Sequence, residues 1–124
     1  GSKVKKITHS PDVQLNGDVF YTCAELEELV PGKFRSLTKL NSNTFLGCNK
    51  LKSLDFTGST ITFIEYNSVK WLYGMEHLVL PETLTYMENW SFERIKHGNI
   101  IFLGPKPTMG GGNVFAYNND NEKC

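Results

Sequence analysis

The side chains best suited to metal binding or redox chemistry are three cysteines and three histidines. They are Cys23, Cys48, Cys124, His9, His77 and His97. A structural zinc site needs such ligands in closely spaced pairs, typically Cys-x-x-Cys followed by a second pair. No two cysteines here have that spacing, and the histidines are scattered along the chain. We therefore expect no structural metal and no cofactor.

A second candidate is the glycine run at residues 110–112, because glycine-rich loops can bind phosphate groups. A phosphate-binding loop would continue into Gly-Lys-Ser or Gly-Lys-Thr at the start of a helix. Asn113 and Val114 follow instead, so we interpret the run as a flexible turn. No Gly-x-Ser-x-Gly nucleophile motif occurs, and the acidic residues are spread as on a solvated surface. The sequence therefore predicts a protein that is not an enzyme.

The charge of the chain excludes other partners. Thirteen basic side chains balance thirteen acidic ones. Nucleic-acid binding usually shows a basic stripe, and the nearest candidate, Lys3 with Lys5 and Lys6, is interpreted as a solvated chain end. No apolar run approaches the roughly 20 residues that span a bilayer. We expect no nucleic-acid partner and no transmembrane segment, and we interpret Gly1 and Ser2 as an expression remnant.

Large apolar residues recur at a nearly constant interval. Phe20, Phe45, Val69 and Phe92 are separated by 25, 24 and 23 residues, and Phe115 follows after another 23. Such self-similarity is typical of repeat proteins, in which each unit adds one coil to a stack. We treat these five residues as anchors, one in each unit.

Other positions repeat in the frame that the anchors set. Three residues after the anchors stand Cys23, Cys48, Leu72 and Ile95. Nine after stand Leu29, Leu54, Leu78 and Ile101, and eleven after stand Pro31, Phe56, Leu80 and Leu103. Eight before the later anchors stand Leu37, Ile61, Leu84 and Pro107, and five before stand Leu40, Ile64, Met87 and Gly110. Most members of these columns are apolar, which predicts that the columns point into one continuous core.

Each unit has the pattern of a short strand, a turn, a second extended piece and a tight turn. Leu54 and Phe56 point to the same side of an extended segment, because side chains alternate with period two. The Phe45-x-x-Cys48 segment suits a single helical or 3₁₀ turn. Stacked units would pair their strands in a parallel ladder, and a period of 23–25 residues falls in the leucine-rich range. We predict a repeat solenoid, a right-handed leucine-rich-repeat superhelix of β-rich α/β type.

These motifs resemble the BspA-type leucine-rich repeat of bacterial surface proteins. Residues 40–56 match its pattern most closely, with Phe45 and Cys48 at the offsets of the family, and residues 78–84 give a second match. The resemblance covers residues 20–117. It implies a secreted or surface-anchored bacterial protein that mediates adhesion by binding proteins or glycans, host-derived ones included, and it implies no catalytic residues or cofactors.

The same frame predicts how the chain is divided. Residues 3–19 form a degenerate first unit, since Leu15 lies five before Phe20, and residues 20–117 form the repeats. Residues 118–124 are either a polar tail or the truncated start of a next strand. The alternative function is a structural spacer or terminal unit in a longer surface stalk, with adjoining repeats or domains and with binding elsewhere.

Residues between the inward positions of each strand are the candidates for partner binding. They are Val30, Asp55, Val79 and Phe102, with Ser53, His77 and Ile100 on the same face. Several are apolar where solvent is expected, which indicates either a contact patch or a surface covered by neighbouring units. A second line, one residue before the Leu40 column, contains Lys39, Phe63, Tyr86 and Met109. We favour cross-strand packing over partner binding for that line.

Cys23 and Cys48 occupy one column on adjacent units. The expected rung spacing of about 5 Å falls inside the window for a disulfide. The alternative is two thiols packed as small apolar groups, and we favour it because Leu72 and Ile95 occupy the same column. Cys124, at the end of the chain, is a candidate for oxidation between molecules.

Overall fold

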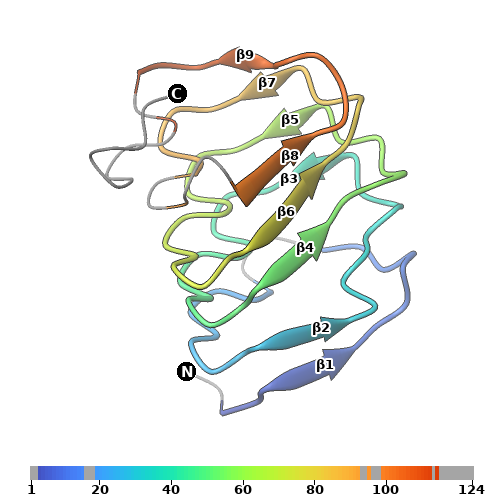
Figure 1. Ribbon diagram of the computed structural model, residues 1–124, viewed down its shortest axis with the longest axis vertical. Coiled ribbons are helices and arrows are strands. Elements are labelled where there is room, and N and C mark those ends of the chain that lie inside the picture. The colour runs from blue at the N-terminus through green and yellow to red at the C-terminus, as the bar shows by residue number, and fades with distance from the viewer. Residues whose placement is uncertain (1–2, 16–18, 93–94, 96–98, 113, 115–124) are drawn as a thin grey trace.

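The chain winds into a stack of coils whose strands form two columns, one on each side of the stack (Figure 1). The computed structural model describes residues 3–15, 19–92, 95, 99–112 and 114. The expected roles of His97, Phe115, Cys124 and residues 118–124 lie outside the described residues. The predicted parallel-strand solenoid is confirmed, with about four turns and almost no helix.

The first column holds the longer strands. They are β1 (Lys6–Thr8), β2 (Glu28–Val30), β4 (Ser53–Asp55), β6 (His77–Leu80) and β8 (Ile100–Phe102). β1 pairs with β2, and β4, β6 and β8 form a separate three-stranded sheet. All of these pairs are parallel, as expected when each coil places its strand beside that of the coil before.

The second column is a four-stranded parallel sheet of two-residue strands. They are β3 (Lys39–Leu40), β5 (Phe63–Ile64), β7 (Tyr86–Met87) and β9 (Thr108–Met109). Lys39, Phe63 and Tyr86 follow one another across this sheet. The rings of Phe63 and Tyr86 are stacked, with centroids 5.3 Å apart and planes 7° from parallel. The interpretation of this line as cross-strand packing is therefore confirmed for its two aromatic members.

The core runs along the axis of the coils and contains the four anchors that the structure describes. The Phe20 and Phe45 rings stack with centroids 5.3 Å apart. Val69 and Phe92 are buried in the same core. Burying a side chain of this size stabilises a fold by roughly 1.5–3 kcal/mol. The core is therefore the main source of stability for strands that are too short to be stable alone.

Phe20, Phe45 and Phe92 each begin a tight turn closed by a hydrogen bond from the residue three positions later. The N–H of Cys48, for example, donates to the Phe45 carbonyl at 3.2 Å. Two positions of this turn take the left-handed conformation. The first position lies two residues before the anchor and is occupied by Asn43, Asn67 and Trp90. The second lies two residues after the anchor and is occupied by Thr22, Gly47 and Trp71. The φ angles of all six lie between 53° and 82°. The repeat thus extends to backbone geometry as well as to side-chain type.

The last coil differs by one residue from the frame predicted by the anchors. Leu78 pairs with Ile100 and not with Ile101, and Met87 pairs with Met109 and not with Gly110. The physical reason is spacing: nine residues lead from Val69 to Leu78, but only eight lead from Phe92 to Ile100. The missing residue shifts every strand position of this coil by one, and such a slip turns each side chain to the other face.

The second coil contains extra residues that break the ladder. We expected Pro31 in the column of Phe56, but Phe34 occupies that place. The N–H of Phe34 donates to the Asp55 carbonyl, just as the N–H of Phe56 donates to Val79. The chain between Val30 and Phe34 bulges outward through Gly32, whose φ of 74° suits glycine. β2 and β4 are consequently unpaired, although we expected a continuous ladder.

Candidate functional site

The outward face of β4, β6 and β8 brings together four of the predicted partner-binding residues. Ser53 lies opposite His77, and Asp55 lies opposite Val79. Ser53 and His77 are exposed and Asp55 is half-buried. Val79 is only 7% exposed, but it does not belong to the main core cluster.

Three other predicted residues do not belong to this face. Ile100 was expected to point outward and is 8% exposed within the core, opposite Leu78. Phe102 was also expected outward, and it is half-buried and packs against the core. Both errors come from the one-residue shift of the last coil. Val30 lies opposite Thr8 in the two-stranded sheet of β1 and β2. It is not the neighbour of Asp55 on β4, because the bulge after Val30 places Lys33 there.

The prediction also missed the residue that completes the outward row. Ile101 lies opposite Val79 and is 42% exposed. Leu103, which we expected inside, is 47% exposed. We call Asp55, Val79 and Ile101 the outward row. The sequence feature behind this register is that eight residues, and not nine, lead from Phe92 to the inward residue Ile100. The apolar pattern does not reveal it, because Ile100 and Ile101 are both apolar.

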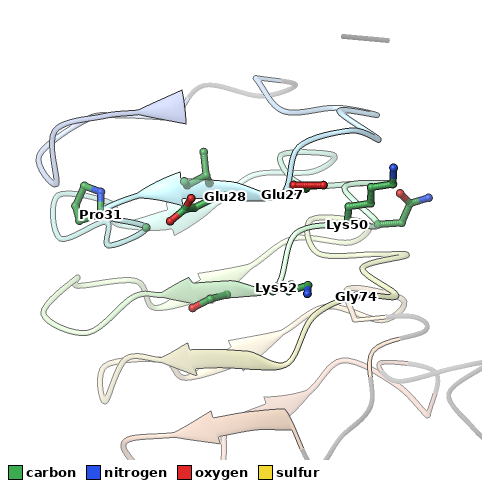
Figure 2. A pocket seen from close by; sticks show the side chains of 10 residues that line it. Glu27, Glu28, Pro31, Lys50, Lys52 and Gly74 are labelled. Atoms are coloured by element: carbon green, nitrogen blue, oxygen red, sulfur yellow. The ribbon is translucent and has the colours of Figure 1, made fainter. Parts of the chain in front are cut away.

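A slot opens between β2 and β4, where the ladder is broken. Its volume is about 780 Å³, within the range of roughly 300–1,000 Å³ that is usual for ligand sites. The slot is lined by Glu27, Glu28, Leu29, Pro31, Gly32, Asn49, Lys50, Lys52, Ser53 and Gly74. Figure 2 shows the two glutamates on the β2 side and the two lysines on the β4 side. The sequence signal for this feature is the Pro-Gly pair, which is typical of a turn inside an expected strand.

Both walls of the slot carry backbone groups without a strand partner. The N–H of Glu28 bonds to Lys5, and the carbonyl of Val30 bonds to His9, so these groups face β1. Alternate residues of a parallel strand bond to opposite sides, and Leu29 therefore faces β4. On β4, Asp55 bonds across to Gly32, so Ser53, two residues before it, faces β2. Among the described residues, no backbone hydrogen bond joins β2 to β4.

Contacts between the two coils lie near both ends of the slot. At one end the Lys50 ammonium bonds the Glu25 carboxylate at 2.8 Å. This hydrogen bond lowers the pKa of Glu25 and raises the pKa of Lys50. At the other end the N–H of Asp55 donates to Gly32 at 3.0 Å. The slot is therefore a short gap between two points at which the adjacent coils are in contact.

Cys23 and Cys48, the two cysteines that the structure describes, do not form a reactive site. Cys23 and Cys48 are both free, in agreement with the interpretation that we favoured. The Cys48 thiol donates a hydrogen bond to the Phe20 carbonyl at 3.0 Å. Burial raises the pKa of Cys48 to about 12, so it is not a thiolate at neutral pH. Within the described ranges, no group of three or more His, Cys, Asp or Glu side chains could hold a metal ion.

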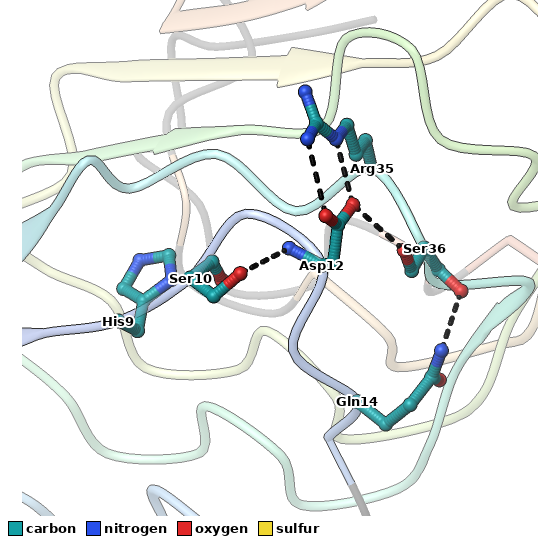
Figure 3. A network of polar contacts seen from close by, with 6 residues as sticks. All are labelled: His9, Ser10, Asp12, Gln14, Arg35 and Ser36. Atoms are coloured by element: carbon teal, nitrogen blue, oxygen red, sulfur yellow. Dashed lines mark hydrogen bonds and ion pairs between the residues drawn. The ribbon is translucent and has the colours of Figure 1, made fainter.

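A polar network ties the first coil to the second (Figure 3). Arg35 bonds both carboxylate oxygens of Asp12, at 2.7 and 3.1 Å. Ser36 adds a bond to the same carboxylate, and Gln14 donates to the Ser36 carbonyl. The hydrogen bond from Arg35 lowers the pKa of Asp12. The network is exposed and links neighbouring coils, so we assign it a structural role.

A second hollow of about 460 Å³ lies at the first coil, beneath β1. Its lining is mainly apolar and includes Val4, Ile7, Val13 and Phe20. Val4 is largely exposed. Most of its lining belongs to the core or packs against it, and His9 and Gln14 are the polar residues among the described ones that line it.

The fold defines a class of protein, a repeat solenoid built from parallel strands. The chain belongs to the family described as the BspA type Leucine rich repeat region, which it matches in six copies over residues 3–122. Comparison with curated proteins gives no match, and neither does comparison with solved structures. In the part of the chain that the structure describes, no helix could cross a membrane.

Proposed function

We propose that this chain is a non-catalytic module of a bacterial surface protein, which binds a protein or glycan through the outward face of β4, β6 and β8. The observation that supports this most directly is the outward row, in which Val79 and Ile101 lie side by side. Ile101 remains 42% exposed although it is a large apolar residue. Exposed apolar area framed by polar groups is typical of contact surfaces.

The surroundings of the row support the same function. Ser53 and His77 lie beside it with exposed polar side chains, which gives the apolar centre and polar rim of an ordinary interface. The parallel ladder holds these side chains on a rigid surface, so little conformational entropy is lost on binding. Members of this repeat family are typically found on bacterial cell surfaces and are typically non-catalytic.

A charge placed on the row tests the proposal. Ile101→Glu is compared with Tyr73→Glu, since Tyr73 is also exposed but lies outside the strands. Both variants and the parent chain are screened against a glycan array and a panel of purified matrix proteins. We expect Ile101→Glu to weaken binding of the selected ligand at least tenfold, as for a central interface residue, and Tyr73→Glu to leave it unchanged.

The screen also decides between binding and architecture. If no ligand binds the parent chain, or if Ile101→Glu binds as well as the parent, the outward row is not the binding surface. A structural spacer in a longer stalk would then be the better interpretation. Circular dichroism and the melting temperature of each variant separate lost binding from lost folding.

A further inference from the structure

We propose that the tight turns at one edge of the solenoid bind a neutral oligosaccharide, which stacks on two aromatic rings and bonds to two side-chain amides. These four side chains are Trp71, Tyr73, Asn43 and Asn49, and we call them the turn edge. They lie outside the two strand columns, and none of them belongs to the outward row. The inference therefore assigns a second binding surface, which does not depend on the proposed function.

Exposed aromatic rings are concentrated at these turns. Tyr66, Trp71 and Tyr73 all lie within four residues of the anchor Val69, and all three are exposed. Tyr21, in the turn of the first anchor, is exposed as well. Tyrosine and tryptophan combine an apolar ring with a polar tip, which suits a surface that is partly wet. Since Trp71 and Tyr73 are two residues apart on one coil, adjacent sugar units can contact the two rings.

Both tryptophans of the chain have a backbone conformation that disfavours large side chains. Trp71 and Trp90 have φ angles of 61° and 65°. The equivalent positions on the preceding coils hold Gly47 and Asn67, two residue types that adopt the left-handed conformation readily. Residues held in such strained conformations are concentrated at ligand contacts and other functional positions. The fold does not require tryptophan at these positions, which supports a role for the rings in binding.

The exposed Trp71 ring borders a residue that has no side chain. The N–H of Gly47 donates to the Lys70 carbonyl at 3.0 Å, which places Gly47 beside Trp71 on the preceding coil. A ligand can therefore extend from Trp71 over this coil without meeting a side chain of Gly47. The Lys70 ammonium lies 5.0 Å from the Trp71 ring centroid, and it is the group that a sugar ring would replace there. The displaced ammonium has three donors, which can bond to the sugar hydroxyl groups.

Two side-chain amides on the same coil as Gly47 are available to a ligand. Asn43 and Asn49 lie on either side of Gly47 in the sequence, the first half-buried and the second exposed. The amide of Asn41 bonds within the protein, whereas among the described residues no protein group bonds to the side-chain amide of Asn43 or Asn49. An added Cβ on Gly74 would lie 2.8 Å from the Asn49 carbonyl oxygen, so Asn49 adjoins the coil of the two rings. An amide carries two donors and an acceptor, which match sugar hydroxyl groups.

Two ion pairs near the turn edge favour an uncharged ligand. The Lys50 ammonium bonds to the Glu25 carboxylate at 2.8 Å. The Glu65 carboxylate accepts a hydrogen bond from the N–H of Ser42 and lies 3.8 Å from the Lys39 ammonium. A charged ligand would compete with these pairs, whereas hydroxyl groups bond to amides without displacing an ion. The charges therefore favour a neutral oligosaccharide over an acidic or a basic one.

Aliphatic side chains contribute little to this surface. The aliphatic residues of the turns around Phe45 and Val69 are Leu46, Val69 itself and Leu72, and all three are buried. The centre of a protein interface is usually formed by closely packed apolar side chains, and here only the rings are exposed. A sugar ring has an apolar face that stacks on an aromatic ring, and it has hydroxyl groups around its rim. This combination matches two rings beside two amides.

The probes for the experiment are linear hexasaccharides of glucose, mannose, xylose and N-acetylglucosamine, with a hexasaccharide of galacturonic acid as the charged control. Each is titrated into the full chain, and binding is followed by isothermal titration calorimetry and by tryptophan fluorescence. We expect at least one neutral hexasaccharide to bind and to shift the emission of Trp71. We expect the galacturonic acid chain to bind at least tenfold more weakly than that neutral probe.

Two glycine substitutions in one column provide a matched pair. Trp71→Gly removes a ring, whereas Thr22→Gly changes the same left-handed position on another coil and removes none. We expect Trp71→Gly to weaken binding at least tenfold, as for a central aromatic contact, and Thr22→Gly to bind like the parent. Asn49→Ala should lose about threefold to tenfold, the effect of a hydrogen bond. Should Trp71→Gly not fold by circular dichroism, Tyr73→Ala removes the second ring from a residue that is 58% exposed.

Several results would overturn the proposal. They are the absence of binding by every neutral hexasaccharide, equal binding of the galacturonic acid chain, and unchanged affinity in folded Trp71→Gly and Tyr73→Ala. A purified protein that binds through Trp71 when no sugar does would assign the turn edge to a different class of ligand. Ile101→Glu separates this inference from the proposed function, since it should leave hexasaccharide affinity unchanged. Tyr73→Glu should abolish hexasaccharide binding, although it leaves a ligand of the outward row unaffected.

Discussion

Gly47 and Trp71 occupy the same left-handed position on successive coils. The N–H of Gly47 donates to the carbonyl of Lys70, and the φ angles of the two residues are 82° and 61°. Glycine adopts this conformation freely, whereas a bulky side chain is strained there. Trp71 is 39% exposed, and the Lys70 ammonium lies 5.0 Å from its ring centroid, a contact that offsets part of this strain.

The left-handed backbone at Trp71 should make glycine a less destabilising replacement than alanine, which is the reverse of the usual order. Trp71→Ala and Trp71→Gly both lose the packing of the ring, so both destabilise the protein. Alanine retains the strain of the left-handed backbone and glycine does not, so we expect Trp71→Gly to be the more stable by about 1 kcal/mol. Urea unfolding of both variants measures the difference. Trp71→Ala as the more stable of the two would contradict the assigned backbone conformation.

Gly104 is required by a close approach between backbones. A Cβ added there would lie 2.6 Å from the carbonyl oxygen of Glu82, a backbone atom that cannot rotate away. We expect Gly104→Ala to cost about 1–3 kcal/mol of stability, as overpacking does elsewhere. Gly112→Ala is the control, because nothing lies within 4 Å of its added Cβ. Equal melting temperatures for the two variants would count against the stacking of these coils.

The Cys48 thiol should make stability fall in alkaline solution. Burial raises its pKa from an ordinary 9.0 to about 12, so between these values the folded protein holds a proton that the unfolded chain releases. The folded state is therefore favoured below pH 9 and loses up to about 1.4 kcal/mol per pH unit above it. Unfolding of the parent and of Cys48→Val is compared at pH 8, 9 and 10.

The difference between these two proteins isolates the thiol from other groups that titrate in the same range. We expect the parent to lose stability faster than Cys48→Val as the pH rises above 9. Valine suits the position because Leu72 and Ile95 occupy the same column. Parallel pH profiles would mean that Cys48 is accessible to water in the folded protein.

The Asp12–Arg35 pair predicts the opposite dependence in acid. The hydrogen bond from Arg35 lowers the pKa of Asp12, so the folded state favours the ionised carboxylate. The resulting stabilisation is complete above the unfolded pKa of about 3.9 and is lost as the pH falls through the lower folded value. The pair is exposed, and we expect a small effect. Melting temperatures of the parent and Asp12→Asn should differ at pH 6 and converge near pH 2.

A constant difference across that range would mean that the asparagine acts through something other than lost charge. Arg35→Gln provides the reciprocal test, because it removes the cation and leaves the carboxylate. Its melting curve should follow that of Asp12→Asn if the two side chains act as one pair.

Much of the fold could be predicted from spacing alone. The interval between Phe20 and Phe45 predicted their stacking, since residues at one phase of a coil must meet when the coils are stacked. Leu54 and Leu78 were correctly placed inside, and they lie opposite each other in the ladder. These features depend on the identity and period of apolar residues, which are local properties of the chain.

The candidate sites depended on features that periodicity does not contain. A coil can be one residue shorter or a few residues longer in any of its turns. Packing against the neighbouring coils determines which turn changes length. That choice turned Ile100 inward and Ile101 outward, and it placed Phe34 where Pro31 was expected. The sequence by itself determined that the chain coils and which columns are apolar. Only the tertiary structure decided which strands pair, because the Pro31-Gly32 pair indicates a turn but does not by itself say that this turn separates β2 from β4.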